Sequence, residues 1–176
     1  MPRFVVLLRG VNVGKANRVP MADFRALLEA QGHTQVQTLL NSGNAVFTST
    51  ARSTPKLASD IGAGLRARFG VTTPVVVKSA GEWRAIVDGN PIVPTDSEHS
   101  RFLVAVAMDV ARLEEVESLR PLLQPGEGLA VTPKAAYLHC AGGLLESRAG
   151  EALLGKAGKG ITTRNWATAL KLSALL

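Results

Sequence analysis

The fold of this chain is constrained most strongly by the order of its apolar segments, because strand-like and helix-like patterns alternate in a defined way. Residues 3–8 form a continuous apolar run of the kind found in buried strands. Apolar residues between 21 and 28 recur at helical spacing, and Gly32 supplies a stop. Two short strands are expected over 36–40 and 45–48. They are separated by Asn-Ser-Gly-Asn, whose residues tolerate the positive φ angles of a hairpin turn.

The next segments extend this pattern to β-α-β-β-α-β. Ser53 or Thr54 followed by Pro55 predicts a helix start, apolar residues then recur in steps of four, and Gly70 ends the run. A strand is expected over 73–78, followed by a short helix that the capping-box pair Ser79 and Glu82 opens. This order is typical of a ferredoxin-like sheet.

The second half repeats the pattern imperfectly. A strand over 102–108, a helix capped by Asp109, a hairpin over 129–140 and a short helix over 147–154 are expected, after which the repeat is lost. We therefore predict an α+β fold of two ferredoxin-like β-α-β-β-α-β type half-domains, the second one degenerate. The expected limits are 1–89 for the first, 90–100 for a linker containing two prolines, and 101–176 for the second, with a C-terminal helix.

Three polar segments contain no carboxylate, and they carry the candidate binding residues. They are 9–18, 41–44 and 162–166, and each combines cationic or amide side chains with glycines or a helix start, a chemistry suited to holding an anion. In a ferredoxin-like topology the loop after the first strand and the turn between the second and third strands lie at one end of the sheet, so 9–18 and 41–44 should be close together. The candidate ligand-binding residues are Arg9, Asn12, Lys15, Asn17, Arg18, Asn41, Asn44, Arg164 and Asn165.

Each segment also has a purely structural explanation. Asn41–Asn44 is an adequate hairpin turn, and Arg9 and Asn12 could satisfy loop backbone. Thr163 is expected to cap the last helix, with Arg164 in its first turn. Since a cation is unfavourable there, Arg164 should meet either a core carboxylate or a ligand phosphate, and the sequence leaves both open.

Charge is concentrated at the two ends of the chain. Residues 1–22 carry a net charge of +4 with no acid, and 147–176 carry another +4, out of +6 overall. This asymmetry favours an anionic partner. However, only one Tyr, two Trp and five Phe are present, and no strand shows an exposed aromatic pair for base stacking. The loop 9–18 also differs from a Walker phosphate loop in its spacing and lacks the hydroxyl that binds magnesium.

Other chemistries have little support. Cys140 is the only cysteine, which excludes an internal disulfide and predicts a reducing cytoplasmic setting. His33, His99 and His139 share no ligand spacing, so we expect no metal site and no cofactor. The apolar run 3–8 is too short for a signal peptide or a membrane span.

Several of these motifs together resemble the bacterial domain of unknown function 1697 family. They are Leu7–Gly14, Val19–Ala22, Asn41–Asn44, Asn90-Pro91 and Thr162–Trp166. The resemblance runs nearly from end to end and implies an α+β fold of related half-domains, without an established activity, substrate or catalytic residue. The family often has glycine where this chain has Lys15 and asparagine where it has Ala167.

The leading hypothesis is a cytoplasmic binding protein that presents these loops to phosphate, with nucleic acid as the favoured ligand. Whether it is an enzyme stays open. One alternative is an enzyme that acts on a small phosphorylated or carboxylated substrate through the same arginines. Another is an oligomerisation or protein-interaction module in which the polar segments merely lock loops to the core. The sequence does not determine the oligomeric state.

Overall fold

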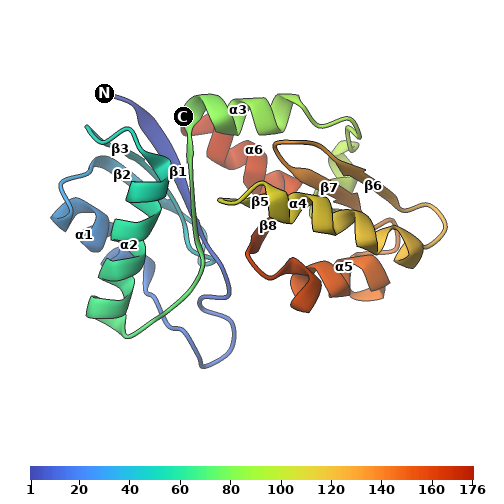
Figure 1. Cartoon of the computed structure of the whole chain (residues 1–176), viewed down its shortest axis with the longest axis horizontal. Helices are drawn as coiled ribbons and strands as arrows, with labels where there is room; N and C mark the ends of the chain where they lie inside the picture. The colour runs from blue at the N-terminus through green and yellow to red at the C-terminus, as the bar shows by residue number, and fades with distance from the viewer. The chain divides into compact units, whose positions relative to one another are not determined.

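The computed structural model describes residues 1–176. It contains two antiparallel four-stranded sheets, and helices connect or follow the strands of each sheet along the chain (Figure 1). Close contacts divide the chain into a first unit of Met1–Arg84 with Leu172–Leu176 and a second unit of Ala85–Lys171. The half-domain limits expected from the sequence remain a prediction. None of the helices has the length and apolar character needed to cross a membrane.

The first unit is a complete β-α-β-β-α-β meander followed by a helix. Its sheet order is β2-β3-β1-β4, the ferredoxin-like arrangement, with every neighbouring pair antiparallel. The elements are β1 (Arg3–Leu8), α1 (Met21–Ala30), β2 (Thr34–Leu39), β3 (Asn44–Thr48), α2 (Thr54–Phe69) and β4 (Val75–Ser79). The helix that follows is α3 (Ala80–Asp88), which belongs to the first unit as far as Arg84.

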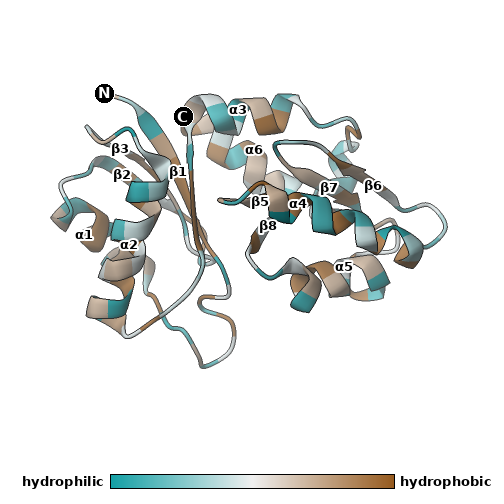
Figure 2. Cartoon of the chain, viewed as in Figure 1, coloured by the Kyte–Doolittle hydropathy of each residue, from teal (hydrophilic) through white to brown (hydrophobic).

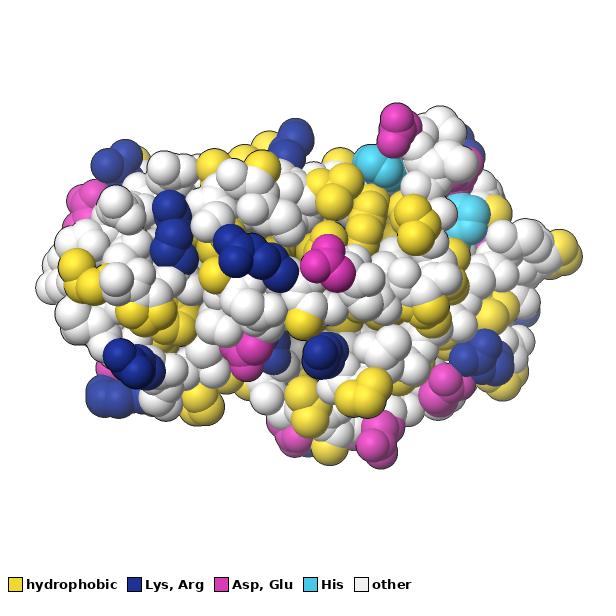
Figure 3. Space-filling view, turned by 90° about the horizontal axis from the view of Figure 1, so that it is seen from above, with side chains coloured by type: hydrophobic (Ala, Val, Ile, Leu, Met, Phe, Trp, Pro, Cys, Tyr) yellow, Lys and Arg dark blue, Asp and Glu magenta, His cyan; other side chains and the backbone are white.

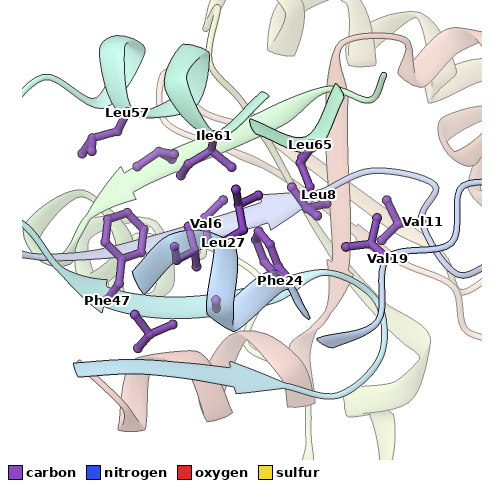
Figure 4. Close-up of a cluster of buried hydrophobic side chains, with 14 of the residues drawn as sticks. Val6, Leu8, Val11, Val19, Phe24, Leu27, Phe47, Leu57, Ile61 and Leu65 are labelled. Atoms are coloured by element: carbon purple, nitrogen blue, oxygen red, sulfur yellow. The ribbon is translucent and has the colours of Figure 1, made fainter. Parts of the chain in front are cut away.

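The core of the first unit lies between one face of this sheet and the helices α1 and α2. Alternate β1 residues Phe4, Val6 and Leu8 belong to it, because side chains along a strand point to opposite faces in turn. They pack with Leu57, Ile61, Leu65 and other residues spaced along α2 (Figure 4). In Figure 2 most of β1 is hydrophobic, whereas α2 alternates hydrophilic and hydrophobic residues along its length. The periodicity of the sequence thus follows the buried faces.

The second unit repeats the same topology, with order β6-β7-β5-β8. Its strands and α-helices are β5 (Phe102–Ala107), α4 (Ala111–Glu114), β6 (Gly128–Val131), β7 (Ala136–His139), α5 (Arg148–Leu154) and β8 (Ile161–Asn165). The last helix is α6 (Trp166–Ala174), which belongs to the second unit as far as Lys171. Four 3-10 helices complete it: η1 (Asp96–Arg101), η2 (Glu115–Leu122), η3 (Leu144–Glu146) and η4 (Lys156–Gly158). The first helix of the predicted repeat is here a short α4 that continues as η2, and η1 occupies much of the expected linker.

The fold-class prediction is confirmed, with one correction in the second half. The sequence predicts loss of the repeat after 154, but β8 pairs with β5 and completes the second sheet, from Leu103 opposite Asn165 to Ala107 opposite Ile161. The β-branched residues Ile161, Thr162 and Thr163 suit a strand, and β5 supplies the partner backbone from more than fifty residues away. The duplication therefore extends through all four strands of each unit.

Candidate functional site

The loop between β1 and α1 is fixed at both ends to the core of the first unit. The side chains of Val11 and Val19 are buried and lie beside Leu8 (Figure 4). At the start of the loop, the Arg9 N–H donates to the Pro74 carbonyl at 3.3 Å, and the Thr73 hydroxyl donates to the Arg9 carbonyl. Since both ends are anchored, the intervening residues 12–18 form a defined loop.

Asn12 clamps this loop to the turn between β2 and β3. Its Nδ2 donates to the carbonyl of Val19 at 2.8 Å and to that of Asn41 at 2.9 Å, while its Oδ1 accepts from the Val19 N–H at 2.8 Å. The backbone of Asn12 has φ 58°, a conformation that asparagine tolerates better than most residues. The structure thus brings the loop and the turn together, as the topology predicts.

The turn approaches the loop closely at Gly43. The Leu8 N–H donates to the Gly43 carbonyl at 2.8 Å. A Cβ on Gly43 would lie 2.6 Å from Leu8 Cβ and 2.9 Å from Val11 Cγ2, and its φ is +81°. Glycine is required here both for space and for backbone conformation.

The other asparagines proposed as ligand contacts also bond within the protein. Asn44 is fully buried, and its Nδ2 donates to the Leu39 carbonyl at 3.0 Å. Asn41 is exposed, and its backbone and side-chain oxygens accept from Asn12. Asn17 is exposed and makes one long bond, from Nδ2 to the Gly10 carbonyl at 3.4 Å. The Asn12 and Asn44 amides therefore stabilise the loop and turn themselves.

The cations of the loop are placed differently from these amides. Lys15 and Arg18 are exposed, whereas Arg9 is half-buried and burial lowers the pKa of its guanidinium. No acid precedes Asp23 in the chain. The loop also alternates positive φ at Gly10, Asn12 and Gly14 with negative φ between them, and the Asn12 N–H donates to the Asn17 carbonyl at 3.0 Å, which closes the loop on itself.

Arg164 and Asn165 belong to the second unit, and their expected position is corrected. They lie in β8 and not in the first turn of a helix, because Arg164 pairs with Val104 of β5 and α6 begins only at Trp166. Asn165, and not Thr163, caps that helix, since its Oδ1 accepts from the Thr168 N–H at 2.9 Å.

The Arg164 side chain lies in a buried environment. Its Nη1 donates to the Thr163 carbonyl at 2.7 Å, and burial lowers the pKa of the guanidinium to about 10.

Sequence reasoning missed a related cation, Lys78. It pairs with Val5 of β1 as Arg164 pairs with Val104 of β5, so each unit has a cation one residue before the end of its last strand. Lys78 is 8% exposed, and burial lowers its pKa, partly offset by Glu82. A lysine directly after the apolar run Val75–Val77 is the signal that could have indicated this position.

The duplicated sheet topology and the clamped basic loop define a class of α+β proteins built from two ferredoxin-like halves. Residues 1–137 match the family described as "Protein of unknown function (DUF1697)", and the chain belongs to that family. The structure of the conserved bacterial protein SP0830 from Streptococcus pneumoniae is similar, with a TM-score of 0.79 and 22% sequence identity over 99% of this chain and 98% of that one. At this identity the likeness shows the fold alone. No curated protein matches the chain.

Proposed function

We propose that the protein binds the phosphate groups of a nucleic acid through the loop Arg9–Arg18. The observation that carries the proposal is the clamped loop itself, which presents the exposed cations Lys15 and Arg18 on a fixed backbone in a segment free of acids. A fixed loop loses little conformational entropy on binding, so its cations can hold phosphate oxygens at lower cost than those of a mobile loop.

The proposed contact is local to the loop. On the face drawn in Figure 3, Lys and Arg side chains are interspersed with acidic ones. Lys15 and Arg18 would contact phosphates, and the exposed amides of Asn17 and Asn41 are near enough in the same loop and turn to contact sugar or base edges. Asn12 and Asn44 would act by holding the loop and turn in shape.

The test is fluorescence anisotropy of labelled single- and double-stranded oligonucleotides of several lengths, titrated at a series of salt concentrations. Wild-type affinity should increase with length and fall linearly in log salt, because each phosphate contact releases counterions. The double variant Lys15→Ala/Arg18→Ala should bind more weakly and reduce the salt slope by about two. The control Lys134→Ala/Lys159→Ala removes the same charge from exposed positions of the second unit and should keep the slope.

Two outcomes contradict the proposal. If no oligonucleotide binds at low salt, the loop does not bind nucleic acid. If both double variants weaken binding equally, overall charge is responsible and the loop has no specific role. If binding does not depend on oligonucleotide length, the ligand of the loop is a small phosphorylated molecule and not a nucleic acid.

A further inference from the structure

A second polar site lies at the other end of the first sheet. Arg3 and Gln35 stand near the starts of β1 and β2, whereas the loop 9–18 follows the end of β1, about 20 Å away along the strand. The depression has a volume of about 430 Å³ and is lined by Arg3, Arg25, Glu29, Gln35, Val36 and Gln37. Val36 is the only apolar residue among them.

Arg3 leaves one positive charge uncompensated in this depression. Its Nε and Nη2 are buried and have no hydrogen-bond partner, and its guanidinium forms no ion pair. The other two charged groups neutralise each other, since Arg25 Nε lies 2.9 Å from Glu29 Oε1. Buried donors without acceptors cost free energy, so the guanidinium would gain from a bound anion.

The backbone of β2 is irregular where it enters the same depression. The pairing of β2 with β3 shifts register between Thr34 and Gln37, and Gln35 has φ 50°. Such bulges re-aim a side chain. The Gln35 Oε1 accepts from the Thr48 hydroxyl at 2.9 Å, which fixes the amide and leaves its two N–H donors for another acceptor. Gln37 is exposed and adds a second amide.

We propose that this depression binds a small polar ligand through a single carboxylate or phosphate group. Arg3 supplies the charged donor, and its guanidinium has to turn outward for the buried Nε and Nη2 to reach two oxygens of a planar or tetrahedral oxyanion. The amides of Gln35 and Gln37 supply neutral donors beside it. The polar lining and its net charge of +1 select a ligand with one anionic group and little apolar surface.

The experiment is NMR titration of the arginine Nε–Hε and backbone amide signals at constant ionic strength, with inorganic phosphate in one series and glycolate in another. A saturable shift of the Arg3 Nε–Hε signal is expected with at least one of these probes, and the stronger one identifies the anionic group. Arg3→Gln should weaken binding at least tenfold, as measured from the accompanying shifts of the Gln35 and Gln37 amide signals. The control Arg66→Gln removes an exposed arginine of α2 and should stay within twofold of wild type.

A second variant covers the case in which Arg3→Gln does not fold. Gln37→Glu alters an exposed position and places a carboxylate inside the depression, so it should also weaken binding about tenfold through repulsion and competition for Arg3. Lys15→Ala/Arg18→Ala should leave the shifts at Arg3 unchanged, which separates this site from the loop. The proposal fails if neither probe gives a saturable shift at Arg3, or if Arg66→Gln weakens binding as much as Arg3→Gln.

Discussion

At the scale of single residues, two asparagines of the loop 9–18 share a backbone conformation but differ in what they hold. Asn12 and Asn17 have φ of 58° and 52°. The side chain of Asn12 makes three hydrogen bonds of 2.8 to 2.9 Å to Val19 and Asn41, whereas that of Asn17 makes one at 3.4 Å. A comparison of variants at the two positions therefore separates the free energy that the clamp contributes from the free energy of the backbone conformation.

Asn12→Ala should lower the free energy of unfolding by about 2–3 kcal/mol, since it loses the clamp as well as the residue type that tolerates positive φ. Asn17→Ala should lower the free energy of unfolding by about 1 kcal/mol or less, because it loses mainly a residue type that tolerates positive φ. Urea denaturation followed by circular dichroism measures both. Equal losses would show that the Asn12 hydrogen bonds contribute nothing beyond backbone preference.

Gly43 and Gly14 form a similar pair. Both have positive φ, 81° and 64°, but only Gly43 lies against other side chains. Gly14→Ala should cost about 1 kcal/mol for the backbone conformation alone. Gly43→Ala should cost about 2 kcal/mol more, because its Cβ would overlap Leu8 and Val11. Thermal and urea unfolding of the two variants compare them directly, and a loss at Gly43 no larger than at Gly14 would mean that turn and loop move apart at little cost.

At the scale of elements, the last strand of each unit passes directly into a helix that its final residue caps. Ser79 ends β4, where the Glu82 N–H donates to its Oγ at 3.2 Å and its own N–H donates to Glu82 Oε2 at 2.7 Å. Asn165 ends β8 and caps α6 through Thr168. Helix capping therefore accounts for an asparagine at position 165 without any contact to a ligand.

Asn165→Ala should therefore lower the free energy of unfolding by about 1 kcal/mol, because a backbone N–H of the first turn loses its acceptor. Asn165→Asp should retain nearly all the stability, since a carboxylate is an equally good cap and favours the helix dipole. The comparison is made by urea denaturation. If Asn165→Asp destabilises as much as Asn165→Ala, the side-chain amide has a role other than capping.

Several helix ends held by local hydrogen bonds were predictable from the sequence, whereas the strand β8 was not. The Ser53 cap of α2, the Gly70 stop and the Ser79–Glu82 box each join residues within five positions, and all three occur as predicted. β8 was missed because its strand character depends on pairing with β5. At the candidate site, topology predicted that loop and turn meet, but not that the Asn12 and Asn44 amides would be used internally.

At the scale of the whole molecule, the duplication places equivalent residues in both units. Lys78 and Arg164 occupy the same register position relative to β1 and β5, and burial lowers the pKa of each. The capping residues Ser79 and Asn165 follow them directly. The two halves thus preserve a strand–cation–cap–helix arrangement although their residue types differ.

The stability of the folded chain should also depend on pH through His33. This side chain is 8% exposed, packs on Phe47 with ring centroids 4.6 Å apart, and has a buried Nε2 without a hydrogen-bond partner. Burial lowers its pKa below the ordinary value of 6.5, an effect that Asp60 partly offsets. The unfolded chain therefore takes up a proton that the folded chain resists as the pH falls below 6.5.

The free energy of unfolding of the wild type should thus decrease between about pH 7.5 and about pH 5, and the part that His33 contributes should be absent in His33→Gln. The difference between the two unfolding curves isolates this histidine, because the remaining titratable groups are common to both proteins. Urea denaturation at a series of pH values measures it. A wild-type curve parallel to that of His33→Gln over this range would mean that the folded state accommodates the protonated imidazole as readily as water does.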